Sequence, residues 1–231
     1  MEVLQSYLGH LIKVLPQLLT GAVLTVKITS LSVFFGILIG LIMALGKLSK
    51  NPLLKIPAVI YVDFIRGTPL FVQILLFYYG IPGLILSITG ETFKIEPMLA
   101  AVVVCSINSG AYVAEIFRAG IQSIERGQME AARSLGMTHN QAMRYVILPQ
   151  AFKRIVPPLG NEFIVLLKDT SLLAVIGVEE LTRKGQLYVA STFASFPTYI
   201  GVALVYLVMT LTISRLVNWT ERRLGVSDRR E

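Results

Sequence analysis

The sequence Glu130-Ala131-Ala132-Arg133-Ser134-Leu135-Gly136 forms a polar interruption in a chain that is otherwise mostly apolar. The residues from Gln128 to Leu135 predict a short helix. Gly136 stands where a left-handed residue would end that helix, because glycine adopts this conformation without a steric penalty. The interruption therefore predicts an ordered helical segment and not a flexible loop.

A second helix is predicted to start immediately afterwards. Thr138 is followed three residues later by Gln141, which is the spacing of a capping box. We expect Pro149 to end this second helix, because proline lacks a backbone N–H and clashes with the preceding turn. Together the two helices predict a capped hairpin.

The composition on both sides of this hairpin is that of a polytopic membrane protein. Hydrophobic residues make up 54% of the chain and charged residues only 15%, with a mean hydropathy of +0.68. A soluble protein with a large core is the alternative, but the charge-free runs are too long for ordinary core helices. Four such runs are present: Ile28–Gly46, Gly67–Gly90, Pro97–Ala114 and Gly185–Ser214.

A fifth apolar segment, Ile155–Val178, contains Glu162, Lys168 and Asp169. We count it as a span, because charges inside a helical bundle are tolerated where they face a partner or an aqueous cavity. The fold class is therefore all-α, with a single transmembrane domain over residues 1–231. The expected spans are about 20–46, 57–80, 97–121, 155–177 and 197–218, and the loop over about 122–154 is expected to be cytoplasmic.

Basic residues predict the orientation. Of the 21 Lys and Arg, 14 lie in residues 47–57, 118–154 and 215–231, and only four lie in the N-terminal tail, after Gly80 and in residues 178–196. By the positive-inside rule the first group faces the cytoplasm, so five spans place the N-terminus outside and the C-terminus inside. The net charge of +7 is thus a topology signal, and we expect no nucleic-acid partner.

The chain offers little material for catalysis. His10 and His139 are predicted on opposite sides of the membrane, and Cys105 is the single cysteine, so neither a metal site nor an internal disulfide is expected. The sequence contains no phosphate-binding loop and no nucleophile elbow. We therefore expect no enzyme activity and no cofactor in this chain, and active transport would need ATP bound by another polypeptide.

Four motifs resemble those of one membrane family. Residues 130–149 resemble the EAA loop of permease subunits in bacterial ABC importers, with Val146 where isoleucine is usual. Arg66-Gly67-Thr68-Pro69-Leu70-Phe71-Val72-Gln73, Ser109–Ile116 with Arg118–Ile121, and Leu167–Leu172 resemble strings of the polar amino acid uptake branch. The likeness runs from about Thr20 to about Arg223.

This resemblance implies a bacterial inner-membrane protein with several partners. They are a second permease copy, most simply an identical one, two cytoplasmic ATPase subunits that bind ATP and Mg, an extracytoplasmic solute-binding protein and the surrounding lipid. It also implies that the loop couples the chain to the ATPase through Glu130, Ala131, Ala132, Arg133, Leu135 and Gly136.

The third span contains candidate solute ligands. Asn108, Tyr112 and Glu115 are spaced i, i+4 and i+7, so they share one helical face. A polar stripe in an apolar helix should face protein or water. It serves either as part of a solute pocket or as hydrogen bonding between helices.

An amino acid carries an ammonium and a carboxylate, and a site in low dielectric must replace the water around both. We expect Glu115 to meet the ammonium or a cationic side chain, as an unpaired carboxylate. Arg66, or backbone freed at a helix break near Pro157 and Pro158, would meet the carboxylate. Arg66 is alternatively an anchor at the membrane boundary.

Asn161 and Asp169 complete the candidate set. Acidic candidates outnumber basic ones, which favours a cationic amino acid as solute. Two other classes remain open on sequence alone. A secondary transporter or channel would need no ATPase, and a membrane scaffold or sensor would need no pocket.

Overall fold

The computed structural model describes residues 2–225, and these residues form helices joined by short loops, without a strand among them. The predicted all-α fold is confirmed. The helices are α1 (Glu2–Leu48), α2 (Pro52–Gly67), α3 (Leu70–Leu75), η1 (Leu76–Gly80), α4 (Ile81–Thr89), α5 (Pro97–Gln122), α6 (Arg126–Ser134), α7 (His139–Ala142), η2 (Met143–Ile147), α8 (Leu148–Asp169), η3 (Thr170–Ile176), α9 (Leu181–Thr192) and α10 (Ser195–Arg223).

The centre of the bundle is the crossing of α1 and α5. Small residues let the two backbones approach, as is common where helices meet in a membrane. A Cβ added at Gly36 would lie 2.9 Å from the Cβ of Ser109, and one added at Gly40 would lie 2.5 Å from Cγ1 of Val113. Around this crossing lies the main apolar core, which includes Ile28.

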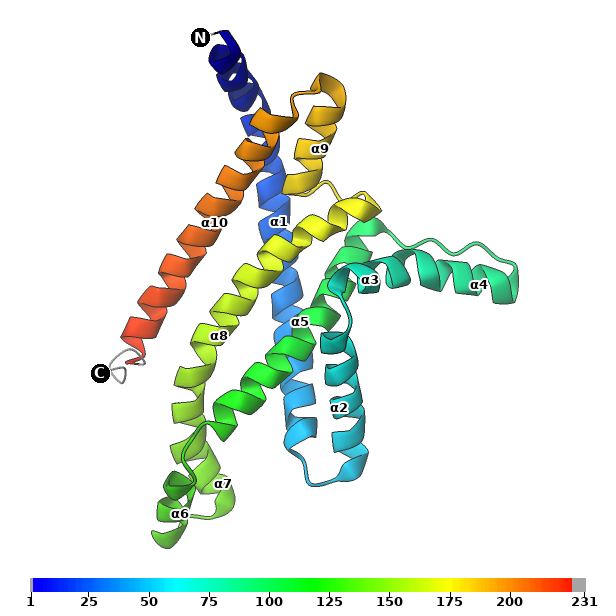
Figure 1. Cartoon of the computed structure of the whole chain (residues 1–231). Helices are drawn as coiled ribbons and strands as arrows, with labels where there is room; N and C mark the ends of the chain where they lie inside the picture. The colour runs from blue at the N-terminus through cyan, green and yellow to red at the C-terminus, as the bar shows by residue number, and fades with distance from the viewer. Residues whose placement is uncertain (1, 226–231) are drawn as a thin grey trace.

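The second predicted span, 57–80, is not one helix. Helix α2 begins earlier, at Pro52, and ends at Gly67. Thr68 is extended, with φ −120° and ψ 143°, because the ring of Pro69 disfavours the α conformation at the residue before it. The chain then continues helically through α3, η1 and α4, which project sideways from the bundle (Figure 1).

The expectation that Pro149 ends a helix is wrong. It lies in the first turn of α8, directly after the π-helical turn η2. In this wider turn Leu148 donates its N–H to the carbonyl of Met143, five residues back. The backbone before Pro149 therefore departs from the i−4 hydrogen-bond pattern, in which a proline ring clashes with the carbonyl of the preceding turn.

The expected helix break at Pro157 and Pro158 is also wrong, since α8 continues through both to Asp169. Helix α8 packs against α5 and α10 along this stretch, and a Cβ added at Gly160 would lie 2.4 Å from Val217. Tertiary packing thus holds the helix where two backbone donors are missing.

Four described helical segments are long and apolar enough to cross a membrane: Gln5–Leu48, Leu70–Thr89, Pro97–Gln122 and Ser195–Arg223. The apolar run Gly185–Ser214 is divided between α9 and α10, with Phe193 in a left-handed conformation at φ 58°. Helix α8 is not among these four segments, because charged residues interrupt its apolar sequence.

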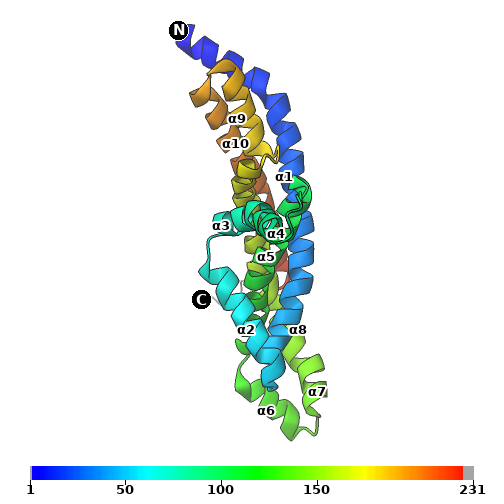
Figure 2. The ribbon, with the colours of Figure 1, turned by 90° about the vertical axis from the view of Figure 1, so that its right-hand side faces the viewer.

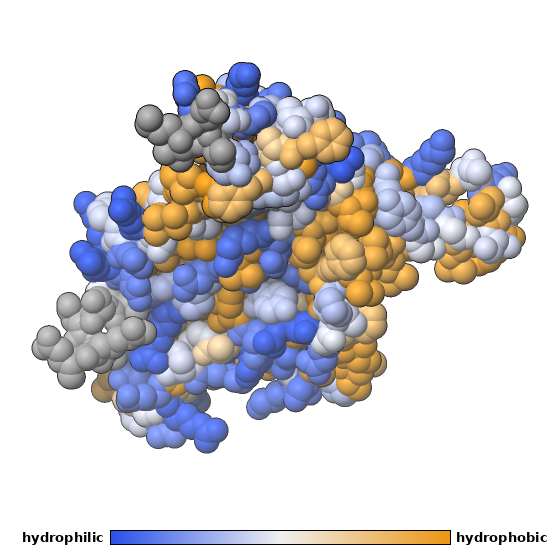
Figure 3. Space-filling model, turned by 45° about the horizontal axis from the view of Figure 1, so that its top comes forward, coloured by the Kyte–Doolittle hydropathy of each residue, from blue (hydrophilic) through white to orange (hydrophobic). Residues whose placement is uncertain are grey.

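The hairpin predicted from residues 130–149 lies at the end of the molecule opposite the N-terminus in both ribbon views (Figures 1 and 2). The projecting helix α4 carries exposed Leu84 and Ile88, and hydrophobic surface covers much of this arm at the right of Figure 3. Apolar surface of this kind suits the lipid interior.

Candidate translocation site and coupling segment

The first part of the candidate coupling segment, α6 and the turn after it, has the geometry that the sequence predicted. Gly136 is left-handed, with φ 86°. The N–H of Gly136 bonds the carbonyl of Arg133 at 3.1 Å, and the N–H of Met137 bonds the carbonyl of Ala132 at 3.2 Å. These two bonds form a Schellman motif, which gives the end of α6 a fixed direction.

The predicted capping box at the next helix is also present. Thr138 Oγ1 accepts from the N–H of Gln141, whose side chain accepts from the N–H of Thr138 at 2.8 Å. Helix α6 begins at Arg126, two residues before the prediction.

The segment presents one buried and several exposed residues. Ala132 is buried, while Glu130, Ala131, Arg133 and Gly136 are exposed, and Leu135 is 83% exposed. Below them, a small core that includes Ile147 and Ile155 holds the hairpin on α8. The exposed residues thus stand on a rigid base.

Two adjoining cavities lie between α2, α5 and α8. One has a volume of about 530 Å³ and the other about 430 Å³. Arg66, Tyr112 and Glu162 line both, and the Arg66 guanidinium lies 5.4 Å from the Tyr112 ring centre. Together they extend from Asp169 to Arg154, with charged residues set among apolar ones, and we call them the α5–α8 path.

The predicted stripe on α5 follows this path. Asn108 and Tyr112 line the larger cavity, and Tyr112 and Glu115 line the smaller one. Asp169 also lines the larger cavity. Arg66 lies at the last turn of α2 and faces both, and not only the membrane boundary.

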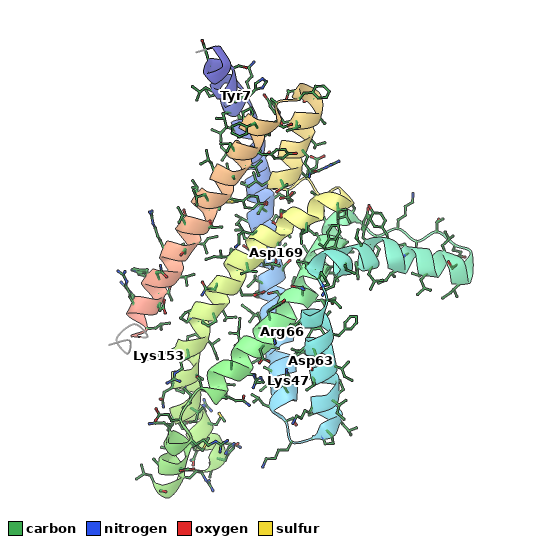
Figure 4. The ribbon with its side chains drawn as sticks, viewed as in Figure 1. Tyr7, Lys47, Asp63, Arg66, Lys153 and Asp169 are labelled. Atoms are coloured by element: carbon green, nitrogen blue, oxygen red, sulfur yellow. The ribbon has the colours of Figure 1, made fainter. Side chains whose placement is uncertain are left out.

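The expectation that Glu115 is an unpaired carboxylate is wrong. Arg118 Nε lies 3.0 Å from both of its oxygens, and Lys47 Nζ lies 3.3 Å from one. Arg66 approaches to 4.0 Å, and Lys47 also reaches Asp63 at 3.9 Å. Figure 4 shows Lys47, Asp63 and Arg66 close together where α1, α2 and α5 meet.

Two other carboxylates on the path have no such partners. Within residues 5–225, no ion pair involves the side chain of Glu162 or that of Asp169, and the Ser109 hydroxyl on α5 lies near the Glu162 carboxylate. Glu162 is 9% exposed, and the two residues lie on one face of α8, seven positions apart. Asn161, in contrast, is exposed and lines neither cavity.

Sequence reasoning could have found Glu162. It shares the i, i+7 face of Asp169, whereas Asn161 shares the face of exposed Lys168.

The comparison with known proteins decides the family. The profile of the binding-protein-dependent transport system inner membrane component family matches residues 36–226. The chain belongs to this family. It is therefore a multi-pass permease of the inner membrane.

The permease is similar over most of its length to several curated proteins. It is 40% identical over 212 residues to the glutamine transport system permease protein GlnP of Escherichia coli K12, covering 92% of this chain and 94% of that one. It is 38% identical to the L-cystine permease protein TcyL of Bacillus subtilis, covering 90% and 87%. It is 38% identical to the arginine permease protein ArtQ of the same species, covering 93% and 95%.

Solved structures agree on the fold. A chain from the crystal structure of an amino acid ABC transporter with histidines superposes with a TM-score of 0.85 at 50% identity, covering 92% of this chain and 96% of that one. The permease also shares its fold with an inward-facing MetNI methionine ABC transporter chain, with a TM-score of 0.65 at 21% identity and coverage of 88% and 95%.

Proposed function

We propose that the permease forms the translocation path of an ATP-driven importer for polar amino acids, with a preference for cationic ones. The observation that carries the proposal is a pair of carboxylates without an ion-pair partner within residues 5–225, Glu162 and Asp169, on the α5–α8 path. A buried carboxylate without a partner is costly, and a cationic solute would supply that partner.

In this proposal the ends of the amino acid bind different helices. Arg66 on α2 receives the α-carboxylate, since a guanidinium matches a carboxylate with two parallel hydrogen bonds. Glu162 receives the α-ammonium. Asp169 lies two helical turns further along α8, about 10 Å away by helix rise, and it receives the cationic end of the side chain. Tyr112 lines both cavities together with Arg66 and Glu162.

Two residues of the sequence-based set take supporting roles. Glu115 is already neutralised by Arg118 and Lys47, so it braces α1 against α5 at the cytoplasmic side of the solute. Asn108 Nδ2 donates a hydrogen bond to Gln73 Oε1 at 3.0 Å. Asn161 faces away from the path and is not assigned a role in it.

We further propose the partners that the family architecture implies. A second permease copy, two ATPase subunits that bind ATP and Mg, and an extracytoplasmic solute-binding protein complete the importer, with five spans, the N-terminus outside and the C-terminus inside. The exposed residues of α6 and its turn, Glu130, Ala131, Arg133, Leu135 and Gly136, meet the ATPase, and Ala132 anchors them from below.

ATP-dependent uptake by proteoliposomes tests the proposal. With the complete importer we expect labelled L-arginine and L-histidine to be taken up in preference to L-glutamate. Glu162→Gln and Asp169→Asn should each raise the apparent KM for the cationic solutes about tenfold to a hundredfold, the equivalent of one charge-assisted hydrogen bond. Lys168→Gln, on the exposed side of α8, is the matched control and should leave KM unchanged.

Two results would contradict the proposal. Uptake that persists without ATP and follows an ion gradient would indicate a secondary transporter instead. ATP-dependent uptake with the same KM in wild type, Glu162→Gln and Asp169→Asn would remove these carboxylates from the solute site.

A further inference from the structure

The break between α2 and α3 leaves a backbone acceptor without its usual donor. In a continuous helix the carbonyl of Ile65 would accept from the N–H of residue 69, four positions later. Residue 69 is proline, which has no N–H. At membrane depth an unpaired carbonyl costs far more than in water, so the break needs another donor.

The side chain of Gln73 supplies that donor. Its Nε2 lies 2.9 Å from the carbonyl oxygen of Ile65, 3.1 Å from that of Thr68 and 2.9 Å from Thr68 Oγ1. Thr68 Oγ1 in turn donates to the carbonyl of Phe64 at 2.9 Å. Gln73 follows Pro69 by four residues, so its side chain reaches back along α3 to the acceptors that the proline leaves free.

The other end of the same amide reaches α5. Gln73 Oε1 accepts from Asn108 Nδ2 at 3.0 Å, and Asn108 is 5% exposed. One side chain therefore ties the end of α2 and the start of α3 to α5. Arg66 lies directly beside Ile65 at this break and lines both cavities.

We propose that Gln73 is a positioning residue that holds the α2–α3 break open and so sets where Arg66 stands in the α5–α8 path, and that Asn108 acts on the solute only through Gln73. The solute part of this inference rests on the proposed function. The structural part, that Gln73 replaces the missing N–H of Pro69, stands without it.

A double-mutant cycle tests the inference. Gln73→Met keeps the length of the side chain and removes every hydrogen bond of the amide, and Asn108→Leu removes the one that the amide oxygen accepts. We expect each single change to raise the apparent KM for labelled L-arginine about tenfold at nearly unchanged maximal rate, the equivalent of one hydrogen bond of ordinary strength. The double variant should be no worse than Gln73→Met, because both changes cut the same link.

A change in the backbone separates positioning from simple stability. Pro69→Ala restores an N–H at residue 69. Combined with Gln73→Met, it should recover the melting temperature that Gln73→Met alone lowers. The KM should stay high in this combination, because the repaired helix no longer presents Arg66 in the same place. Ser87→Ala, on the exposed surface of α4, is the matched control for the arm and should change neither quantity.

The melting-temperature results test the role of Gln73 separately from the proposed transport function. The melting temperatures of the assembled complex need no solute, so they report on the Gln73 bonds even if no amino acid is transported. If the double variant of Gln73→Met and Asn108→Leu has a KM about a hundredfold above wild type, the two effects multiply, and Asn108 contacts the solute directly. An unchanged melting temperature in Gln73→Met, or recovery of KM by Pro69→Ala, would overturn the positioning role.

Discussion

Glu115 provides the most detailed prediction, because its cationic partners lie on three helices, α1, α2 and α5. We expect Glu115→Gln to lower the stability of the permease and to leave its KM for solute nearly unchanged. The bonds from Arg118 are made within α5 at i, i+3 and do not join helices. The bond from Lys47 joins α1 to α5, and the Glu115 side chain is 23% exposed.

The magnitude follows from the interhelical hydrogen bond that Lys47 donates to Glu115. A hydrogen bond to a charged group contributes about 1.5–3 kcal/mol when it is shielded from water. At about 2–4 °C per kcal/mol for a domain of this size, the melting temperature should fall by about 3–12 °C. Glutamine also leaves Arg66 and Arg118 without this counter-charge, and Lys47 with only Asp63 at 3.9 Å, which adds to the loss in the same direction.

Thermal unfolding of the detergent-purified complex, paired with uptake kinetics, measures both effects. Asp63→Asn is the control: its carboxylate is 67% exposed and 3.9 Å from Lys47, so its loss should cost at most about 1 kcal/mol. An unchanged melting temperature together with a tenfold higher KM in Glu115→Gln would refute the bracing role and return Glu115 to the solute site.

Three further predictions concern other parts of the chain. Gly136→Val should uncouple ATP hydrolysis from uptake, because a β-branched residue at φ 86° costs about 1–2 kcal/mol of conformational energy, whereas Gly127→Val within α6 should not; normal uptake in Gly136→Val would contradict the coupling geometry. A cysteine at Asn140 should react with a membrane-impermeant reagent only from the cytoplasmic side and one at Leu187 only from outside, and the reverse pattern would overturn the orientation. Burial raises the pKa of the Glu180 carboxyl above its ordinary value of 4.5, so the folded state holds this proton more tightly than the unfolded state. The wild type should therefore lose stability as pH rises through the range just above 4.5, and Glu180→Gln should not. Equal pH dependence of the melting temperature in the two proteins would contradict this prediction.

The backbone of α6 and of the capped turn after it was predictable because its signals are local. A glycine that ends one helix, and a threonine N-cap two residues later with Gln at its N3 position, determine their own backbone bonds, and the structure shows both motifs at Gly136 and Thr138. The all-α class followed equally from the length and apolar character of the runs.

The pairing of Glu115 was not predictable in the same way. Its interhelical partner Lys47 lies 68 residues earlier in the chain, and only the packing of α1 on α5 brings the two together. The path of α8 through Pro149, Pro157 and Pro158 likewise depends on tertiary contacts and on a π-helical turn that no local rule indicates. The i, i+7 relation of Glu162 to Asp169, in contrast, was available in the sequence.

Identification of the solute that remains bound to the purified complex tests the central claim most directly. Mass spectrometry of small molecules released from the wild-type importer should find an amino acid with a positively charged side chain, at close to one per permease chain. The same preparation from Glu162→Gln combined with Asp169→Asn should release little of it, while Lys168→Gln should release as much as the wild type. A neutral or acidic solute, or equal amounts from all three preparations, would contradict the assignment of the α5–α8 path to cationic amino acids.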